Sequence, residues 1–338
     1  MRVLKVSNDA HRLVTLVAAT SATDLWVYGT ADGVALDALR HWDGSAWTVP
    51  PLDDATAMVV TGGWRNAAPG APGHVWVGTN TGTSLLDLTA DGHAIEHGPE
   101  VGAVFGANFL MASGMDTTYV ATNFATPALY ALNAAGLFTR VPQDPPGFVV
   151  GLRVTPDGKL WAAYDDAKNA NAQSLARFDG QAWTLITVPN GVTADLNFAY
   201  ASTNDVWKTV VRATDATAWQ VARFDGTAFT TVSVAAPAGW GSTGLRHNGL
   251  DYMAQLGNGK VGLLSVKQNV VASGDTIHLD MIANEIVGAG LGSDIAIFHV
   301  SDCVAAGCPN PPTFGAYYGD SGLILSGGRD VFVGGLHD

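Results

Sequence analysis

The chain has 338 residues, of which 14% are charged and 40 are glycine, and its formal net charge is -13. Because 17 lysines and arginines are scattered among 30 acidic residues, no basic face is expected, which excludes nonspecific nucleic-acid binding and disfavours an anionic membrane surface. Few charges, many glycines and 10 tryptophans favour short strands joined by tight turns over helices.

The two ends of the chain read as parts of one sheet. Residues 2–9 and 11–17 resemble two strands, and residues 330–338 (DVFVGGLHD) resemble a second strand with nothing after it. We therefore predict that the N-terminal strands serve as the third and fourth strands of the last sheet, which removes its bare edge. The start of the chain lacks the apolar core of a signal peptide, and no apolar run reaches the roughly 18 residues of a membrane span.

Residues 24–49, DLWVYGTADGVALDALRHWDGSAWTV, carry the local pattern that recurs in the rest of the chain. Runs of strand-forming residues cover 25–28 and 35–42, and a third run follows directly after the second. Asp43-Gly44 between the last two runs predicts a hairpin turn, since glycine adopts a positive φ without a Cβ clash.

Strands of the DLWVYG type recur at intervals of 35 to 50 residues, which matches the roughly 40 to 50 residues of a four-stranded propeller blade. Each is followed by a strand, a turn that closes on glycine and the start of another strand, and each is preceded by a short apolar stretch. Every unit therefore has four strands. The aromatic or apolar centres of these strands are Trp26, Trp76, Tyr119, Trp161, Trp207, Tyr252, Val287 and Phe332.

This period predicts an all-β fold, a β-propeller of four-stranded antiparallel blades, in a single domain that spans residues 1–338. We expect eight blades, with the last one completed by the N-terminal strands. Seven blades is the alternative, because the markers are weakest between residues 250 and 300. In a propeller the first strand of each blade is innermost and lines the central channel.

The best-matching units are DLWVYG with LRHWDGSAW (39–47), KLWAAY with LARFDGQAW (175–183), and NDVWKTV with VARFDGTAF (221–229). They resemble the DVWAVG…hWDGsxW repeats of secreted or surface β-propeller proteins of myxobacteria and related bacteria. The resemblance covers most of the chain, and is looser from residue 249 on. It implies a propeller fold in which tryptophan packs between blades and Asp-Gly forms a turn. The family is largely uncharacterised, and the resemblance therefore carries no catalytic residues across.

Two cysteines, Cys303 and Cys308, lie close together in the loop sequence CVAAGCPNPP. Two thiols make a poor structural zinc site, which takes four ligands. We predict instead a small disulfide loop, which implies an oxidising compartment. The protein is accordingly expected to be secreted or to lie on the cell surface, with its signal peptide missing from this sequence.

Two short sequences match catalytic motifs without the context that the motifs need. His93, Glu96 and His97 spell H-x-x-E-H, a zinc-protease motif that requires a helix. Here they follow a turn in a strand context, where residues four apart lie about 13 Å apart, so we predict a solvent-facing fourth strand. Residues 319–322 (GDSG) resemble the serine region of trypsin-like proteases, but we read them as a loop before a strand.

Polar residues recur at similar places on the predicted innermost strands. A charged side chain there costs several kcal/mol if it is buried without a partner. We therefore expect such residues to line a wet channel and meet a ligand, or alternatively to pair with one another in the channel wall. The candidates are Arg153, Asn197, Arg246 and Asp280, with His247 and His278 beside them.

The loops that lead from one blade into the innermost strand of the next, here called lead-in loops, carry aromatic and charged residues. Exposed aromatic rings stack on sugars or small aromatic ligands while polar groups hydrogen-bond to them. The alternative for many of these aromatics is packing between blades. The residues are Trp64, Arg65, Phe105, Phe148, Trp240, Tyr317 and Tyr318, with the carboxylates of Asp53 and Asp54.

These features predict a ligand-binding propeller that takes a carbohydrate or another small polar molecule on the face of the lead-in loops. Two alternatives stay open: a hydrolase or lyase with carboxylate, histidine and arginine groups at the channel mouth, and a protein-interaction scaffold that uses the rim. No sequence has the spacing of a calcium loop, and the loop carboxylates are the groups that could hold a structural or site cation.

Overall fold

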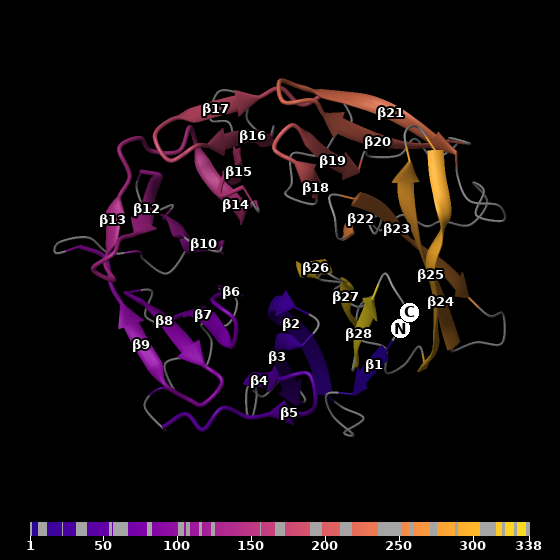
Figure 1. Ribbon diagram of the computed structural model, residues 1–338, viewed down its shortest axis with the longest axis horizontal. Helices are drawn as coiled ribbons and strands as arrows, with labels where there is room; N and C mark the ends of the chain where they lie inside the picture. The colour runs from indigo at the N-terminus through magenta and orange to yellow at the C-terminus, as the bar shows by residue number, and fades with distance from the viewer. Residues whose placement is uncertain are drawn as a thin grey trace. The chain divides into compact units, whose positions relative to one another are not determined.

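The structure is a computed structural model that describes residues 2–5, 12–21, 23–31, 39–53, 56, 67–79, 83–100, 105, 109–114, 117–122, 126–155, 157–165, 173–189, 198–209, 218–235, 252–256, 260–270, 276–287, 290–304, 316–319, 322–327 and 330–335, with residues 80–82 and the other gaps left out. In this part of the chain the named elements are 28 β-strands, which form seven four-stranded sheets (Figure 1). None of the described residues belongs to a helix long and apolar enough to cross a bilayer.

Four of the sheets follow one another along the first half of the chain. They are β2 (Arg12–Ser21), β3 (Asp24–Ala31), β4 (Leu39–Trp42) and β5 (Trp47–Thr48); β6 (Ala67–Pro69), β7 (His74–Gly78), β8 (Leu85–Thr89) and β9 (Ala94–His97); β10 (Phe109–Ser113), β11 (Thr118–Thr122), β12 (Ala128–Leu132) and β13 (Phe138–Arg140); and β14 (Phe148–Val154), β15 (Leu160–Asp165), β16 (Gln173–Phe178) and β17 (Trp183–Ile186).

Three more sheets complete the described strands. They are β18 (Phe198–Ser202), β19 (Asp205–Thr209), β20 (Ala218–Phe224) and β21 (Phe229–Ala235); β22 (Tyr252–Leu256), β23 (Lys260–Val270), β24 (Thr276–Val287) and β25 (Gly290–Val304); and β26 (Ala316–Gly319), β27 (Gly322–Gly327), β28 (Asp330–Gly335) and β1 (Arg2–Lys5). Consecutive strands of each sheet pair antiparallel, so the prediction of four-stranded antiparallel blades is confirmed.

The sheets fall into two compact units. One unit covers Lys5–Ile186 and Ala194–Leu196, and the other covers Met1–Leu4, Thr187–Thr193 and Asn197–Asp338. Within the first unit β2 contacts β6, β6 contacts β10 and β10 contacts β14; within the second, β18 contacts β22 and β22 contacts β26. In each unit the first strands of consecutive sheets are therefore neighbours, with the fourth strands on the opposite side (Figure 1).

The aromatic residue of the DLWVYG-type strand packs against the following sheet. Trp26 of β3 is fully buried and shares a cluster with Val75 and Val77 of β7. Because side chains alternate along a strand, Trp76 points the other way and packs with Phe138 of the sheet after it. An aromatic side chain buries about 150 to 250 Å², so these residues provide a large part of the contact between consecutive sheets.

The Asp-Gly pairs form the predicted hairpin turns between third and fourth strands. Gly44 has a φ of 94°, and Oδ1 of Asp43 accepts hydrogen bonds from the backbone N–H groups of Ala46 and Ser45, each at 2.8 Å. These bonds, together with one from the Ser45 hydroxyl, lower the pKa of the Asp43 carboxyl to about 2. The same pair of backbone bonds is found at Asp179-Gly180 and Asp225-Gly226.

The chain that leaves one fourth strand bonds to the fourth strand of the next sheet. Beyond β9, the carbonyl of Gly98 accepts the N–H of Phe138, and the carbonyl of Phe138 accepts the N–H of Glu100, both at 3.0 Å. Beyond β17, the carbonyl of Thr187 accepts the N–H of Phe229 at 3.5 Å. Outer edges that would otherwise be bare are thus partly paired.

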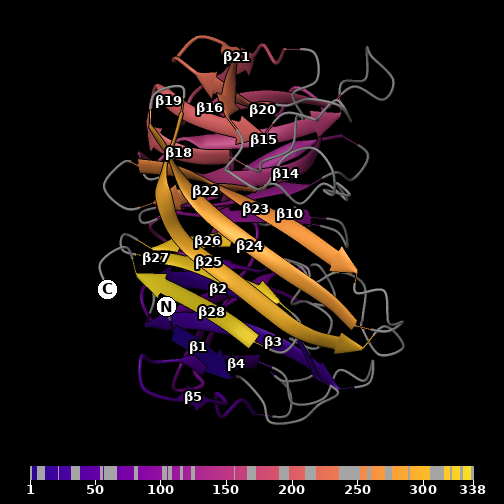
Figure 2. The same cartoon turned by 90° about the vertical axis from the view of Figure 1, so that its right-hand side faces the viewer.

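The sheet that joins the two chain ends differs from the prediction by one strand. β1 lies next to β28, so the N-terminal chain does complete the last sheet, but as a single fourth strand (Figure 2). β2, predicted as another strand of that sheet, is the first strand of the following one. The reason is β26, a strand of four residues that the sequence pattern treats as loop and that makes β28 the third strand instead of the second.

The stretch from β22 to β28 also differs from the pattern. Tyr252 lies on β22, a first strand, while Val287 and Phe332 lie on the third strands β24 and β28; all three were predicted at the centres of second strands. β23, β24 and β25 have 11, 12 and 15 residues and are the longest strands described (Figure 2). One sheet therefore occupies chain length that the pattern divides between two, and the described strands give seven sheets, the alternative to eight.

Candidate functional site

An exposed aromatic residue begins the inner strand β14. Phe148 is 43% exposed, and Val150 is exposed as well. The register of β14 against β15 shifts between Val149 and Gly151, which places Val150 in a β-bulge. Bulges are frequent next to binding sites because they redirect a side chain. Asp165, the exposed last residue of β15, lies directly opposite Phe148, and we call Phe148, Val150 and Asp165 the β14 ledge.

The lead-in loop before the ledge is held at its start by an ion pair. Nε of Arg140 donates to Oδ1 of Asp144 at 3.0 Å, and Nη2 of the same guanidinium donates to the other carboxylate oxygen. This hydrogen bonding raises the pKa of Arg140. The loop is also bound to β17, because the N–H of Trp183 donates to the Gln143 side chain at 2.9 Å and the Trp183 indole donates to the Gln143 carbonyl at 3.1 Å.

The end of the same loop packs tightly on β15. Pro145 is buried, and a Cβ atom placed on Gly147 would lie 2.5 Å from the carbonyl oxygen of Asp165 and 2.8 Å from the ring of Tyr164. Contacts below 3.0 Å to backbone atoms require the chain to move, so glycine is needed here. The loop is thus fixed at several points and presents Phe148 from an ordered frame.

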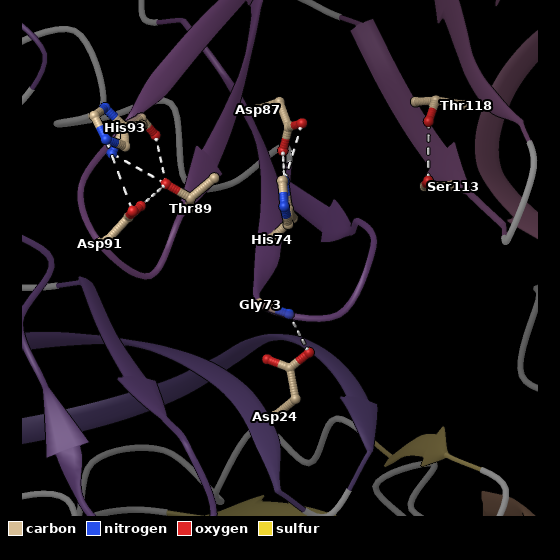
Figure 3. A network of polar contacts seen from close by, with 9 residues as sticks. All are labelled: Asp24, Gly73, His74, Asp87, Thr89, Asp91, His93, Ser113 and Thr118. Atoms are coloured by element: carbon tan, nitrogen blue, oxygen red, sulfur yellow. Dashed lines mark hydrogen bonds and ion pairs between the residues drawn. The ribbon is translucent and has the colours of Figure 1, made fainter.

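Acid–base pairs recur at one position of the repeat. One partner lies two residues before the aromatic residue of the second strand, and the other lies on the third strand, opposite that aromatic residue. Nε2 of His41 lies 2.7 Å from Oδ1 of Asp24, and both side chains are buried. The other oxygen of Asp24 accepts the N–H of Gly73, in the next sheet, at 2.7 Å (Figure 3). The equivalent pairs are His74–Asp87 at 3.0 Å and the two-bond pair Arg223–Asp205 at 2.8 Å.

These pairs have a packing role. Arg223 lies over the ring of Trp207, with 5.1 Å from Cζ to the centroid, and the His41 ring lies 4.6 Å from that of Trp26. The hydrogen bonds that Arg223 donates to Asp205 raise the pKa of Arg223, as expected for a retained ion pair. Each acid is therefore engaged in joining strands or covering a tryptophan.

The H-x-x-E-H sequence has no metal-site geometry. Residues 94–97 form β9, an exposed fourth strand, as predicted. Nε2 of His93 lies 3.7 Å from Oδ2 of Asp91 (Figure 3). Glu96 accepts a serine hydroxyl, and Nδ1 of His97 lies 2.9 Å from the carbonyl oxygen of Gly136. The three side chains thus have separate partners. Among the described residues no three His, Cys, Asp or Glu side chains are grouped closely enough to hold a metal.

The predicted ring of inner-strand residues is only partly correct in its placement. Arg153 does lie on an inner strand, half-buried and opposite Trp161. His278 and Asp280 lie on β24, and the prediction that they belong to an innermost strand is wrong. Asp280 is opposite Lys267 of β23, because the long strands of this sheet make residues 276–287 a third strand.

The remaining candidates divide into placed and unplaced residues. Phe105 is fully buried against Phe109 and Phe138, so for this residue packing between sheets is correct. Tyr317 and Tyr318 lie on the inner strand β26, and Cys303 lies on β25. The residues outside the described part are Trp64, Arg65, Asn197, Trp240, Arg246, His247, Asp54, Cys308, Asp320 and Ser321. Sequence reasoning does not identify Asp165 as a site residue. The feature that could have pointed to it is an acidic residue at the end of a strand that contains aromatic residues.

Comparison with protein-family models and with curated proteins gives no match. Among solved structures, a puromycin-hydrolyzing peptidase of Mycobacterium tuberculosis is similar, with a TM-score of 0.58 and 13% identity over 97% of this chain and 52% of that one. A prolyl endopeptidase has a TM-score of 0.51 and 11% identity, over 95% of this chain and 46% of that one. A streptogramin B lyase has a TM-score of 0.49 and 10% identity, over 98% of this chain and 97% of that one.

The likeness at these identities concerns the fold alone. This chain spans about half the length of the two peptidases that it matches. The antiparallel four-stranded sheets and the structural neighbours identify the fold as a β-propeller.

Proposed function

We propose that this propeller binds a carbohydrate or another small polar molecule at the β14 ledge. The observation that carries the proposal is the exposed ring of Phe148 at the start of an inner strand. An aromatic face stacks on the C–H face of a sugar, and the carboxylate of Asp165 opposite it accepts hydrogen bonds from sugar hydroxyls. Val150, exposed in the bulge of the same strand, adds further apolar surface there.

The fixed lead-in loop supports this proposal. Binding costs about 0.5 to 1.5 kcal/mol for each flexible side chain that must be ordered, and more for a loop. The Arg140–Asp144 pair and the bonds between Gln143 and Trp183 order the loop before a ligand arrives. A ledge built in advance binds small ligands with less loss of affinity.

The test is the variant Phe148→Ala, titrated calorimetrically with a panel of neutral mono- and oligosaccharides. We expect about tenfold weaker binding, because stacking contributes about 0.5 to 1.5 kcal/mol beyond the area buried. Leu185→Ala is the matched control, since Leu185 is a 63% exposed apolar residue on the outer strand of the same sheet. Equal affinities of the two variants, or no binding of any saccharide by the wild type, would refute the proposal.

We further propose that the protein is secreted and has a Cys303–Cys308 disulfide. The support is the resemblance to secreted repeat proteins and the spacing of the two cysteines in the sequence. Thiol titration of the protein purified from an oxidising compartment and unfolded without reductant should give no free thiol. Two free thiols per chain would rule the disulfide out.

A further inference from the structure

The polar side chain of the β14 ledge is a carboxylate that is open to solvent. Asp165 is exposed, and an ionised carboxylate offers hydrogen-bond acceptors but no donor. Within the described part of the chain, no lysine, arginine or histidine forms an ion pair with it. A ligand group that supplies both donors and positive charge is therefore the chemical complement of this side chain.

The ring of Phe148 lies beside this carboxylate. Phe148 and Asp165 are directly opposite each other on the neighbouring strands β14 and β15 (Figure 1). Opposite residues of an antiparallel pair project from the same face of the sheet, with Cβ atoms about 4.5 to 5.5 Å apart. A cation is attracted to the face of an aromatic ring within about 6 Å of its centroid. One ammonium group can therefore lie close to the ring and the carboxylate at once.

The charges around the ledge also favour a cation over an anion. The guanidinium of Arg140, in the lead-in loop, is engaged with both carboxylate oxygens of Asp144. Arg153 lies near the other end of β14, half-buried and opposite Trp161. The net charge of -13 adds a long-range attraction for cations and repels anions.

We propose that the β14 ledge binds an amino sugar, a saccharide with a protonated amine, in preference to neutral and acidic saccharides. This inference rests on the proposed function, because it names the ligand class of the same site. The sugar stacks on Phe148, and an ammonium at its edge donates charge-assisted hydrogen bonds to Asp165. Stacking acts on charged and neutral sugars alike, so the preference comes from the carboxylate and from the attraction of the cation to the ring.

The experiment compares an oligomer of glucosamine with the matching oligomer of N-acetylglucosamine by calorimetric titration at about pH 6, where the amine is protonated. The two probes share the same sugar ring and differ in the charge of the nitrogen substituent. We expect the wild type to bind the glucosamine oligomer about tenfold more tightly, because the ion pair and the cation–π attraction act only on the charged form. This preference should diminish as the salt concentration rises.

Two variants and a control assign the preference to residues. Asp165→Asn removes the charge at nearly constant size, and should abolish the preference for the amine. Phe148→Ala should weaken the binding of both oligomers, because both stack on the ring. Glu100→Gln is the matched control, since it removes one negative charge from an exposed position beyond β9 and should leave the preference unchanged.

The outcomes separate this inference from the proposed function. Equal binding of the two oligomers by the wild type would refute the preference for an amine and leave the proposed function standing. A preference that persists in Asp165→Asn as it does in Glu100→Gln would come from the charge of the whole chain, and would also overturn the inference. If the wild type binds neither oligomer and no neutral saccharide, the proposed function and this inference are both wrong.

Discussion

The five sheets from β2 to β21 and the strands from β22 to β28 build the same kind of four-stranded unit in different ways. In these five sheets the second strand carries a buried tryptophan or tyrosine, and in four of them, with Trp26, Trp76, Tyr119 and Trp207, this residue shares a hydrophobic cluster with the following sheet. From β22 on, that tryptophan and the Asp-Gly turn are missing from the sequence, and β23, β24 and β25 pair over much longer stretches. The comparison shows that the aromatic and the turn are one means of specifying a blade, and that long strand pairing, as in the sheet β22–β25, is another.

The comparison also separates residues of the fold from residues of function. Where an acid, a base or an aromatic recurs at the same place in several sheets, as with Asp24–His41 and Asp205–Arg223, its contacts explain it as packing. Phe148, by contrast, is an exposed aromatic residue on an inner strand and takes part in none of these recurring contacts. A residue whose exposure conflicts with its type is a candidate for function, because functional sites are where sequence and local structure are expected to disagree.

The largest effect is expected from removing an aromatic of the repeat. Trp26→Ala should lower the free energy of unfolding by about 3 to 5 kcal/mol, because Trp26 is fully buried between two sheets. Denaturation in guanidinium chloride measures the loss. Ile95→Ala, at a 54% exposed position on β9, should change stability by less than about 0.5 kcal/mol. Similar losses in both variants would contradict the packing role of the aromatic.

A smaller loss is expected at the recurring acid–base pair. Asp24→Asn should cost about 2 kcal/mol, because it weakens a buried hydrogen bond to His41 and another to Gly73 in the next sheet. Asp205→Asn should cost less than about 1 kcal/mol, since the Arg223 side chain of that pair is 48% exposed. The same denaturation assay compares them. An equal loss of stability in both variants would mean that the hydrogen bond between Asp24 and Gly73 of the next sheet does not stabilise the protein.

The Asp-Gly turns can be ranked by the space around their glycines. Gly180→Ala should cost about 1 to 2 kcal/mol, because φ is 101° but no atom lies within 4 Å of the added Cβ. Gly44→Ala should cost more, since its added Cβ would also lie 2.9 Å from the side chain of Thr23. Thermal unfolding of the two variants tests the order. A Gly44 variant that is the more stable of the two would disprove it.

The smallest effect is expected in the acid dependence of the turns. The pKa of Asp43 is about 2 when folded and 3.8 when unconstrained, so its contribution is complete above pH 3.8 and is lost as the pH falls toward 2. Backbone hydrogen bonds lower the pKa values of Asp179 and Asp225 in the same direction. Replacing all three by asparagine should flatten the fall of Tm between pH 4 and pH 2. An unchanged slope would place the acid sensitivity elsewhere.

Much of the fold is predictable because local chemistry and tertiary packing agree in it. Trp26 is a strand-forming aromatic in a strand, and Gly44 is a glycine where φ is positive. β26 is not predictable in this way, because its four residues are placed by tertiary contacts, namely pairing with β27 and contact with β22. The burial of Lys208 is also not predictable from the sequence. Alternation of side chains along a strand suggests that one face of the sheet meets solvent, whereas a sheet that is packed on both faces buries the side chains of both.

The pairing of β1 with β28 has a consequence for biosynthesis. At about 5 to 20 residues per second, β1 leaves the ribosome roughly 15 to 60 seconds before its partner is made. The sheet of β26, β27, β28 and β1 therefore cannot form in the order of translation. We expect this sheet to be completed only once β28 has been synthesised, and pairing between strands so far apart in the sequence is slow. During that interval β1 lacks the strand with which it pairs, and an unpaired strand of this kind is a target for chaperones.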